Sequence, residues 1–417
     1  MVLRVDVPSA MVHGDVEQGY GPVADAFRRN FAQRREIGAA CAVYRDGRKV
    51  VDLWGGYRDG PAREPWERHT MVPVFSTTKG VSSMAVAVLH SRGLLDYDQP
   101  VAAYWPEFAA AGKAGVTVRQ LLSHQAGLAV IDRPLDLRDL SGSPTLAAAL
   151  ADQRPAWTPG EHHGYHGTTL GWYESELVSR IDSRGRHLGQ FFADEVAKPL
   201  GLEFHIGLPD SVDRRRIARF HGFRPWEMLL HLNAMPAAFA LAFANPRSLS
   251  ARAFRNPRVL GVPDSINRPE VQAAEIPAVN GVGEVRSIAR LYGDAATGGG
   301  GLGLTTSTLD ELTSPAATPS RGLDDQILRL PTQYSLGYMK PFPAFRFGSA
   351  SGTAFGTMGL GGSFAFADPD TGVGFAYAMN RSGFHLWDDP REVALREALF
   401  TTVLGERPQR PDAPAAR

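Results

Sequence analysis

The chain has 417 residues, of which 43% are hydrophobic and 21% charged, and this is the composition of a globular protein with a large core. Its 44 basic and 44 acidic residues give a formal net charge of zero, so no long-range field attracts nucleic acid or an anionic membrane surface. The single cysteine, Cys41, excludes an intramolecular disulfide and a zinc site built from several cysteines.

The N-terminal part of the chain predicts a helix followed by a β-hairpin. Residues 1–17 lack the apolar core of a signal peptide, and no apolar run in the chain is long enough to span a bilayer, so we expect a cytoplasmic protein without a transmembrane segment. Residues 23–35 have helical spacing. The β-rich runs 38–44 and 49–55 flank Asp46-Gly47, which is a strong hairpin signal.

Ser76 and Lys79 open a largely apolar run, residues 81–95, that predicts a helix ending near Gly93. Three residues apart, the two side chains lie on one helix face. A serine hydroxyl needs a base to become a nucleophile, and a lysine with a lowered pKa can supply it while the helix N-terminus favours the developing charge. An ordinary helix start with Ser76 as its cap is the alternative, and the pair alone does not decide between them.

The middle of the chain favours helices and loops. A short helix is predicted at 101–105, and a longer one at 116–128 capped by Gly127. Further helices are predicted at 147–151, 169–181, 187–198, 212–220, 226–232 and 237–243. Alternating strands are scarce here but recur before and after, so we expect a mostly helical domain, 116–274, inserted into an α/β domain formed by 1–115 and 275–406.

The C-terminal third returns to strands. A helix-bearing stretch, 276–297, is followed by a second hairpin formed by 362–367 and 373–379. An amphipathic helix at 392–404 closes the fold, and the Pro- and Ala-rich tail, 407–417, is expected to be disordered.

Two further stretches carry candidate functional groups. Tyr165 can act as a base only if cations lower its pKa, as a neighbouring lysine would; the alternative is an aromatic packed at a loop-to-helix junction. The glycine-rich stretch 355–363 lets a substrate carbonyl approach a backbone N–H group; the alternative is a turn that needs positive φ. Adjacent His162 and His163 have no partner at metal spacing, so no metal site is expected.

Taken together, three stretches resemble the serine β-lactamase and penicillin-binding-protein superfamily, and most closely its class C-like branch and the family VIII carboxylesterases. They are Ser76-x-x-Lys79, Tyr165-His166-Gly167 and Thr357-Met358-Gly359. The resemblance covers nearly the whole chain. It implies an α/β (α+β) fold in which an antiparallel sheet is flanked by helices, with a mostly helical domain alongside and the active site in the cleft between them.

The resemblance also implies a role for each site residue. Ser76 would be the acylated nucleophile, and Lys79 would assist its deprotonation and help to hold Tyr165 as a phenolate. Tyr165 would pass a proton to the leaving alcohol and later activate water, and which of the two is the acylation base stays open. The N–H groups of Ser76 and Leu360 would form the oxyanion hole. The remaining third-motif and pocket residues implied are Thr357, Met358, Gly359, Gly361, Gly362 and His166.

Two departures from the β-lactamase pattern favour an ester substrate. Gly167 stands where β-lactamases carry Asn, and Thr357 where they carry Lys or His, so two groups that would contact a β-lactam are missing. We therefore predict a serine carboxylesterase for small short-chain acyl esters, working through an acyl-enzyme without a metal or organic cofactor. A β-lactamase, a D-amino-acid peptidase or amidase, and an acyltransferase of the same fold are the alternatives. A non-catalytic, assembly-forming member is a more remote one.

Overall fold

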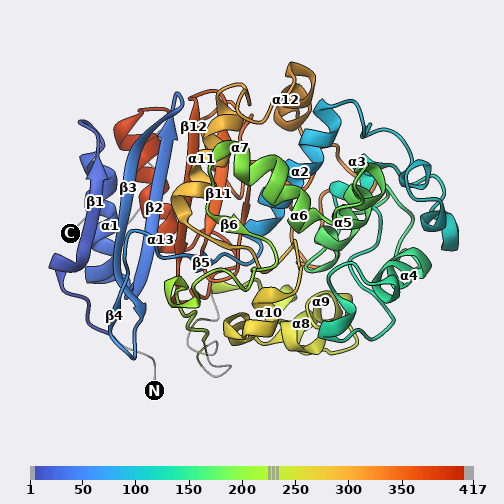
Figure 1. Ribbon diagram of the computed structural model, residues 1–417, viewed down its shortest axis with the longest axis horizontal. Coiled ribbons are helices and arrows are strands. Elements are labelled where there is room, and N and C mark those ends of the chain that lie inside the picture. Colours follow the sequence, from blue (N-terminus) through green and yellow to red (C-terminus); the bar gives the residue numbers. More distant parts are fainter. Residues whose placement is uncertain (1–4, 224–226, 228–230, 232–233, 408–417) are drawn as a thin grey trace.

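The computed structural model describes residues 5–407 except 224–226, 228–230 and 232–233 (Figure 1). Its main sheet has nine strands in the order β1-β3-β2-β12-β11-β10-β9-β8, with β4 paired to β3. All these pairings are antiparallel. The strands are β1 (Val12–Val16), β2 (Gly38–Arg45), β3 (Arg48–Asp59), β4 (Glu64–Pro65), β8 (Tyr334–Ser335), β9 (Tyr338–Met339), β10 (Phe355–Met358), β11 (Phe364–Asp368) and β12 (Val373–Met379).

Both predicted hairpins are confirmed, and they meet in the middle of the sheet. In the β2–β3 hairpin, Asp46 and Gly47 have φ of 50° and 74°, the left-handed pair that suits a two-residue turn between twisted strands. Strand β12 of the second hairpin pairs with β2 over seven residues, for example Phe375 opposite Val43. The sheet therefore joins segments from the N-terminal and C-terminal parts of the chain.

Helices cover both faces of the sheet. Helix α11 (Val285–Ala296) packs on β2, β11 and β12, where Gly374 leaves room for its backbone. The next residue, Phe375, points to the opposite face and stacks on Phe366. Phe366 in turn contacts Phe400, which lies in the π-helical turn after α13 (Pro390–Glu397). Helix α1 (Gly21–Gln33) packs against α13. The predicted antiparallel sheet flanked by helices is confirmed.

Helix α2 (Thr77–Ser91) lies between the sheet and the other helices (Figure 1). It contacts β10 on one side and α5 (Thr169–Ile181) and α6 (Leu188–Phe192) on another. A small sheet of β5 (Val72–Pro73), β7 (Val282–Gly283) and β6 (Phe204–His205) leads into its start. The remaining α-helices are α3 (Val118–Leu122), α4 (Pro144–Asp152), α7 (Lys198–Leu200), α8 (Ala237–Ala244), α9 (Leu249–Arg252), α10 (Pro269–Ala273) and α12 (Thr306–Thr313). No helix in the described ranges is long and apolar enough to cross a membrane.

Several predicted helices are wrong or shorter. The helix predicted at 116–128 is only α3, because His124 takes a left-handed φ of 60°, and Gly127 therefore does not cap it. Residues 212–220 form only a short 3-10 turn, since the N–H of Ala218 donates to Met71 O instead of to its own segment. Most of the helix predicted at 226–232 and the tail 408–417 lie outside the described residues.

Candidate active site

Ser76 stands at the start of α2 on a constrained turn. The preceding residue, Phe75, has a φ of 48°, a left-handed conformation that is rare for an aromatic residue. The turn is held by the Val74 N–H, which donates to Gly281 O at 3.0 Å, and by the Thr78 hydroxyl, which donates to Phe75 O at 2.5 Å. The Ser76 hydroxyl is thus presented, partly exposed, at the N-terminal end of a buried helix.

Lys79 is fully buried and directed at the serine. Its Nζ donates to Ser76 Oγ at 3.0 Å, to Gly167 O at 2.8 Å and to Ala278 O at 2.9 Å. Burial lowers the pKa of Lys79 to about 7, and the carboxylate of Glu174 opposes that shift. A neutral Lys79 amine would donate its two hydrogens to the two carbonyls. Its lone pair would then point to the third neighbour, the Ser76 hydroxyl.

Tyr165 completes the cluster from the loop before α5. Its hydroxyl interacts with the Ser76 side chain, and Lys79 Nζ lies 4.6 Å from the centroid of its ring. Burial raises the pKa of Tyr165; the hydrogen bond to Ser76 opposes this shift and the charge of Asp325 adds to it. The direction is opposite to the one expected from a neighbouring lysine, because desolvation outweighs the cation, and Tyr165 is a neutral phenol in this arrangement.

Asp325 anchors the main chain of Tyr165. The Tyr165 N–H donates to the two carboxylate oxygens of Asp325 at 3.2 and 3.0 Å. Asp325 is 1% exposed and also accepts from the N–H groups of Ile327 and Leu328, both at 2.7 Å, and from the Tyr334 hydroxyl at 2.9 Å. A buried carboxylate with this many donors fixes the loop that carries the phenol.

The third motif is tied to α2 by side chain and backbone. Thr357, 3% exposed, donates to Thr77 O at 3.0 Å and accepts from the Gly80 N–H at 3.1 Å, so its side chain faces the helix and not solvent. A Cβ on Gly359 would lie 2.2 Å from Val74 O. Glycine is required there because β10 ends in contact with the turn that carries the nucleophile.

Two N–H groups beside Ser76 are available to a substrate oxygen. Neither the N–H of Ser76 nor that of Leu360 donates to any backbone group among the residues that the structure describes. Gly361 and Gly362, with φ of 89° and 112°, form the turn after Leu360, and the hydroxyl of Ser363 donates back to the carbonyl two residues before Ser76 at 2.9 Å. Leu360 itself is 40% exposed. Two N–H groups without a backbone acceptor are what an oxyanion hole requires, and that role for Ser76 and Leu360 stays a prediction.

The two remaining predicted pocket residues lie deeper. His166 is completely buried, and its ring nitrogens have no hydrogen-bond partner within the described ranges. Burial lowers the pKa of His166 to about 3, so the ring is neutral, and it packs edge-on against His124 at 4.9 Å. Met358 is partly buried against the main core.

The position after Tyr165-His166 has no room for a side chain. A Cβ on Gly167 would lie 2.6 Å from the ring of Phe254 and 2.9 Å from a main-chain oxygen. The Phe254 ring also lies 6.3 Å from that of Tyr165, and 6.4 and 6.1 Å from those of Phe239 and Phe243. The side of the site next to Tyr165 is therefore aromatic and apolar.

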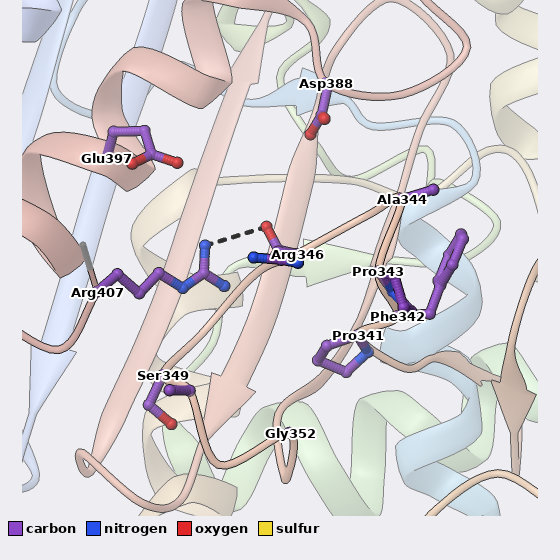
Figure 2. Close-up of a pocket in the computed structure, with 11 residues that line it drawn as sticks. Pro341, Phe342, Pro343, Ala344, Arg346, Ser349, Gly352, Asp388, Glu397 and Arg407 are labelled. Carbon is purple, nitrogen blue, oxygen red and sulfur yellow. Dashed lines mark hydrogen bonds between the residues drawn. The ribbon is translucent and has the colours of Figure 1, made fainter. Parts of the chain in front are cut away.

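A cavity of about 470 Å³ lies elsewhere, between the loop 341–352 and the C-terminal helical turn (Figure 2). Its charged lining groups, Arg346, Asp388, Glu397 and Arg407, balance in sign, and Arg407 Nη1 donates to Arg346 O at 3.2 Å. None of the candidate catalytic residues lines it. In the described part of the chain, no three His, Cys, Asp or Glu side chains come together as a metal site.

Two buried acids near the site were missed from the sequence. Glu174 could have been found, because on the predicted helix 169–181 it shares the apolar face with Leu170 and Leu177. Asp325 lies in a loop without periodicity, and only the folded chain brings it to Tyr165.

Comparison with known proteins agrees with this geometry. A model of the Beta-lactamase family matches residues 23–399. The esterase/beta-lactamase LipL of Mycobacterium tuberculosis is 35% identical over 89% of this chain and 83% of its own. A crystal structure of a family VIII carboxylesterase has a TM-score of 0.79 and 36% identity, covering 93% of this chain and 99% of that one. The structure of EstA from Arthrobacter nitroguajacolicus has a TM-score of 0.80 and 31% identity, covering 94% and 99%. The chain belongs to the β-lactamase family and is a serine hydrolase.

Proposed function

We propose that this protein is a carboxylesterase that cleaves short-chain acyl esters through an acyl-enzyme on Ser76. The observation that carries the proposal is the pairing of Ser76 Oγ with the Nζ of a buried lysine at 3.0 Å, where burial lowers the pKa of Lys79 to about 7. An amine with that pKa is substantially neutral at physiological pH and can accept the serine proton. The names of LipL and of the family VIII carboxylesterase support ester cleavage.

In acylation, Lys79 takes the proton of Ser76 as Oγ attacks the ester carbonyl. The N–H groups of Ser76 and Leu360 hold the oxygen on which negative charge develops. The neutral phenol of Tyr165 then gives its proton to the leaving alkoxide, so the alcohol departs and the acyl group stays on Ser76. This leaves Lys79 as an ammonium and Tyr165 as a phenolate, two opposite charges held close together.

In deacylation, the same two groups act in reverse. The Tyr165 phenolate takes a proton from water, whose oxygen attacks the acyl carbon. Ser76 Oγ leaves and regains its proton from the Lys79 ammonium. The carboxylic acid is released, and both groups return to their starting protonation states. Lys79 is thus the base for the serine, and Tyr165 the acid for the alcohol and the base for water.

The surroundings support a neutral substrate with a small acyl group. Thr357 carries no charge and its hydroxyl is already hydrogen-bonded to the α2 backbone, and Gly167 cannot be replaced by a larger residue without moving Phe254. A β-lactam carboxylate and its acylamide would therefore lose the two partners that β-lactamases supply. The aromatic side chains beside Tyr165 suit an apolar group instead.

The test is hydrolysis of p-nitrophenyl acetate, butyrate and octanoate beside a chromogenic cephalosporin. Ser76→Ala is the test variant, and Ser91→Ala, near the other end of α2, is the matched control. We expect ester turnover that falls about 10³-fold or more in Ser76→Ala, remains in Ser91→Ala, and is greatest on the short chains.

Other outcomes would point elsewhere. Strong cephalosporin cleavage that is lost in Ser76→Ala would make the protein a β-lactamase, an activity that the name of LipL also includes. Ester turnover that survives in Ser76→Ala would remove Ser76 as nucleophile. No detectable turnover of any of the four substrates would refute the esterase proposal in favour of an amidase, an acyltransferase or a non-catalytic member.

A further inference from the structure

A buried carboxylate from α5 contacts α2 one helical turn after Lys79. Glu174, on α5, is completely buried, and its two oxygens accept from Ser83 Oγ at 2.6 Å and Ser82 Oγ at 3.0 Å. Both serines follow Lys79 on α2 by three and four residues, which places them on the same side of the helix. The acid is therefore fixed by hydrogen bonds to the helix that carries Ser76 and Lys79, and not by a cation in direct contact.

Lys79 and Glu174 influence each other electrostatically. Burial lowers the pKa of Lys79 to about 7 and raises that of Glu174 to about 7, and each charge opposes the shift of the other. The hydrogen bonds from Ser82 and Ser83 also favour the ionised acid. Lys79 and Glu174 thus titrate in the same pH range, as expected of a coupled pair.

The other titratable groups around the pair remain neutral near pH 7. Tyr97 and Tyr338 face Glu174, and burial raises the pKa of both phenols. Tyr165, His124 and His166 face Lys79; burial raises the pKa of the phenol and lowers those of the two imidazoles. Of the described groups that interact with Lys79, Glu174 alone supplies a negative charge near neutral pH.

We propose that Glu174 is a positioning residue that acts through Lys79: its buried carboxylate balances the ammonium formed when Lys79 takes the serine proton, and so sets the pH range in which acylation occurs. The inference rests on the proposed esterase function. It predicts that the acid limb of the pH profile of kcat/KM, which reports ionisation in the free enzyme, belongs to the Lys79–Glu174 pair.

The experiment compares Glu174→Gln with Glu176→Gln. Glu176 is also buried on α5, but its carboxylate pairs with Arg180. Without the charge at 174 the ammonium is less stabilised, so Lys79 loses its proton at lower pH. We expect the acid limb of kcat/KM for p-nitrophenyl acetate to move down by roughly 1 pH unit in Glu174→Gln and to stay in place in Glu176→Gln.

A second variant covers the case in which Glu174→Gln does not fold. Ser83→Ala removes the shorter hydrogen bond to the carboxylate, favours its protonated form, and should move the limb in the same direction by a smaller amount. An acid limb that coincides with wild type or moves upward overturns the inference, while loss of activity in Ser76→Ala leaves the proposed function standing. If instead wild-type turnover survives in Ser76→Ala, the proposed function fails first.

Discussion

Lys79 and Lys340 are two buried lysines with nearly the same environment. Lys340 is 2% exposed, and its Nζ donates to Leu312 O at 2.9 Å and to the carbonyls of Thr313 and Thr353, both at 3.2 Å. Burial lowers its pKa to about 7, the same value as for Lys79. Each amine is enclosed by three oxygen acceptors, and the two differ in what those acceptors can do.

Around Lys340 all three acceptors are carbonyls. Two of them end α12, where a cation complements the helix dipole, and the third belongs to the loop before β10, so the lysine joins two segments. Around Lys79 one acceptor is the Ser76 hydroxyl, at the start of a helix. A buried lysine with a lowered pKa is thus not catalytic by itself. Chemistry requires a neighbour that can give up a proton.

The strongest test of this difference exchanges each lysine for methionine. Lys79→Met should reduce kcat for p-nitrophenyl acetate by about 10³-fold, because the proposed mechanism then lacks the base that takes the Ser76 proton. Lys340→Met should leave kcat per folded molecule near wild type but lower the free energy of unfolding by about 2–4 kcal/mol, since three buried carbonyls lose their donor. Rates from single-turnover assays and urea unfolding check both, and equal loss of kcat in the two variants would contradict the comparison.

The second test concerns the phenol, which has no counterpart beside Lys340. Tyr165→Phe should lower kcat by about 10²-fold or more, because the leaving alkoxide loses its proton donor, while the fold is retained. The deficit in kcat/KM, which reports acylation, should shrink for esters of more acidic alcohols, because these leaving groups need less protonation. Comparing p-nitrophenyl and ethyl butyrate measures this, and near-normal rates on both would remove Tyr165 from the mechanism.

Asp325 allows a finer test of how Tyr165 is held. In Asp325→Asn an amide replaces an acceptor of several hydrogen bonds, so we expect kcat to fall about 10-fold through misplacement of Tyr165, with a stability loss of about 2 kcal/mol. The control is Asp310→Asn on α12, a residue whose main-chain oxygen accepts from the hydroxyls of Thr313 and Ser314, bonds that the substitution leaves in place. A change in stability without a change in kcat would limit Asp325 to a structural role.

The smallest effect is on the pH dependence of stability. Between about pH 7.5 and 9 an unfolded lysine is protonated, whereas Lys340 in the fold is mostly neutral. The unfolded state then binds more protons, so Lys340 makes stability rise with pH in this window. Urea midpoints of wild type should rise more steeply from pH 7.5 to 9 than those of Lys340→Met. Parallel curves would show that Lys340 keeps its ordinary pKa.

The parts of the site that depend on local sequence could be predicted. Ser76 and Lys79 are one turn apart, and that spacing alone places them together on α2. The two hairpins follow from their turn residues, and α5 was predicted with its observed bounds because its periodicity is regular. These features need no information from distant segments.

What could not be predicted comes from distant parts of the chain. The two carbonyls that orient Lys79 belong to Gly167 and Ala278, and no pattern in either segment marks a main-chain oxygen as a lysine partner. The inward direction of Thr357 depends on how β10 meets α2.

The pairing of β2 with β12 governs when the protein can first act during its synthesis. Ser76 and Lys79 are translated before Leu360 and before residues 373–379, the strand that joins the two halves of the sheet. A nascent chain therefore holds its nucleophile and base long before it has an oxyanion hole. Until β12 has been made, the edge of β2 that β12 will cover stays unpaired. An unpaired strand edge can pair with another chain, so the nascent protein is exposed to aggregation until this point.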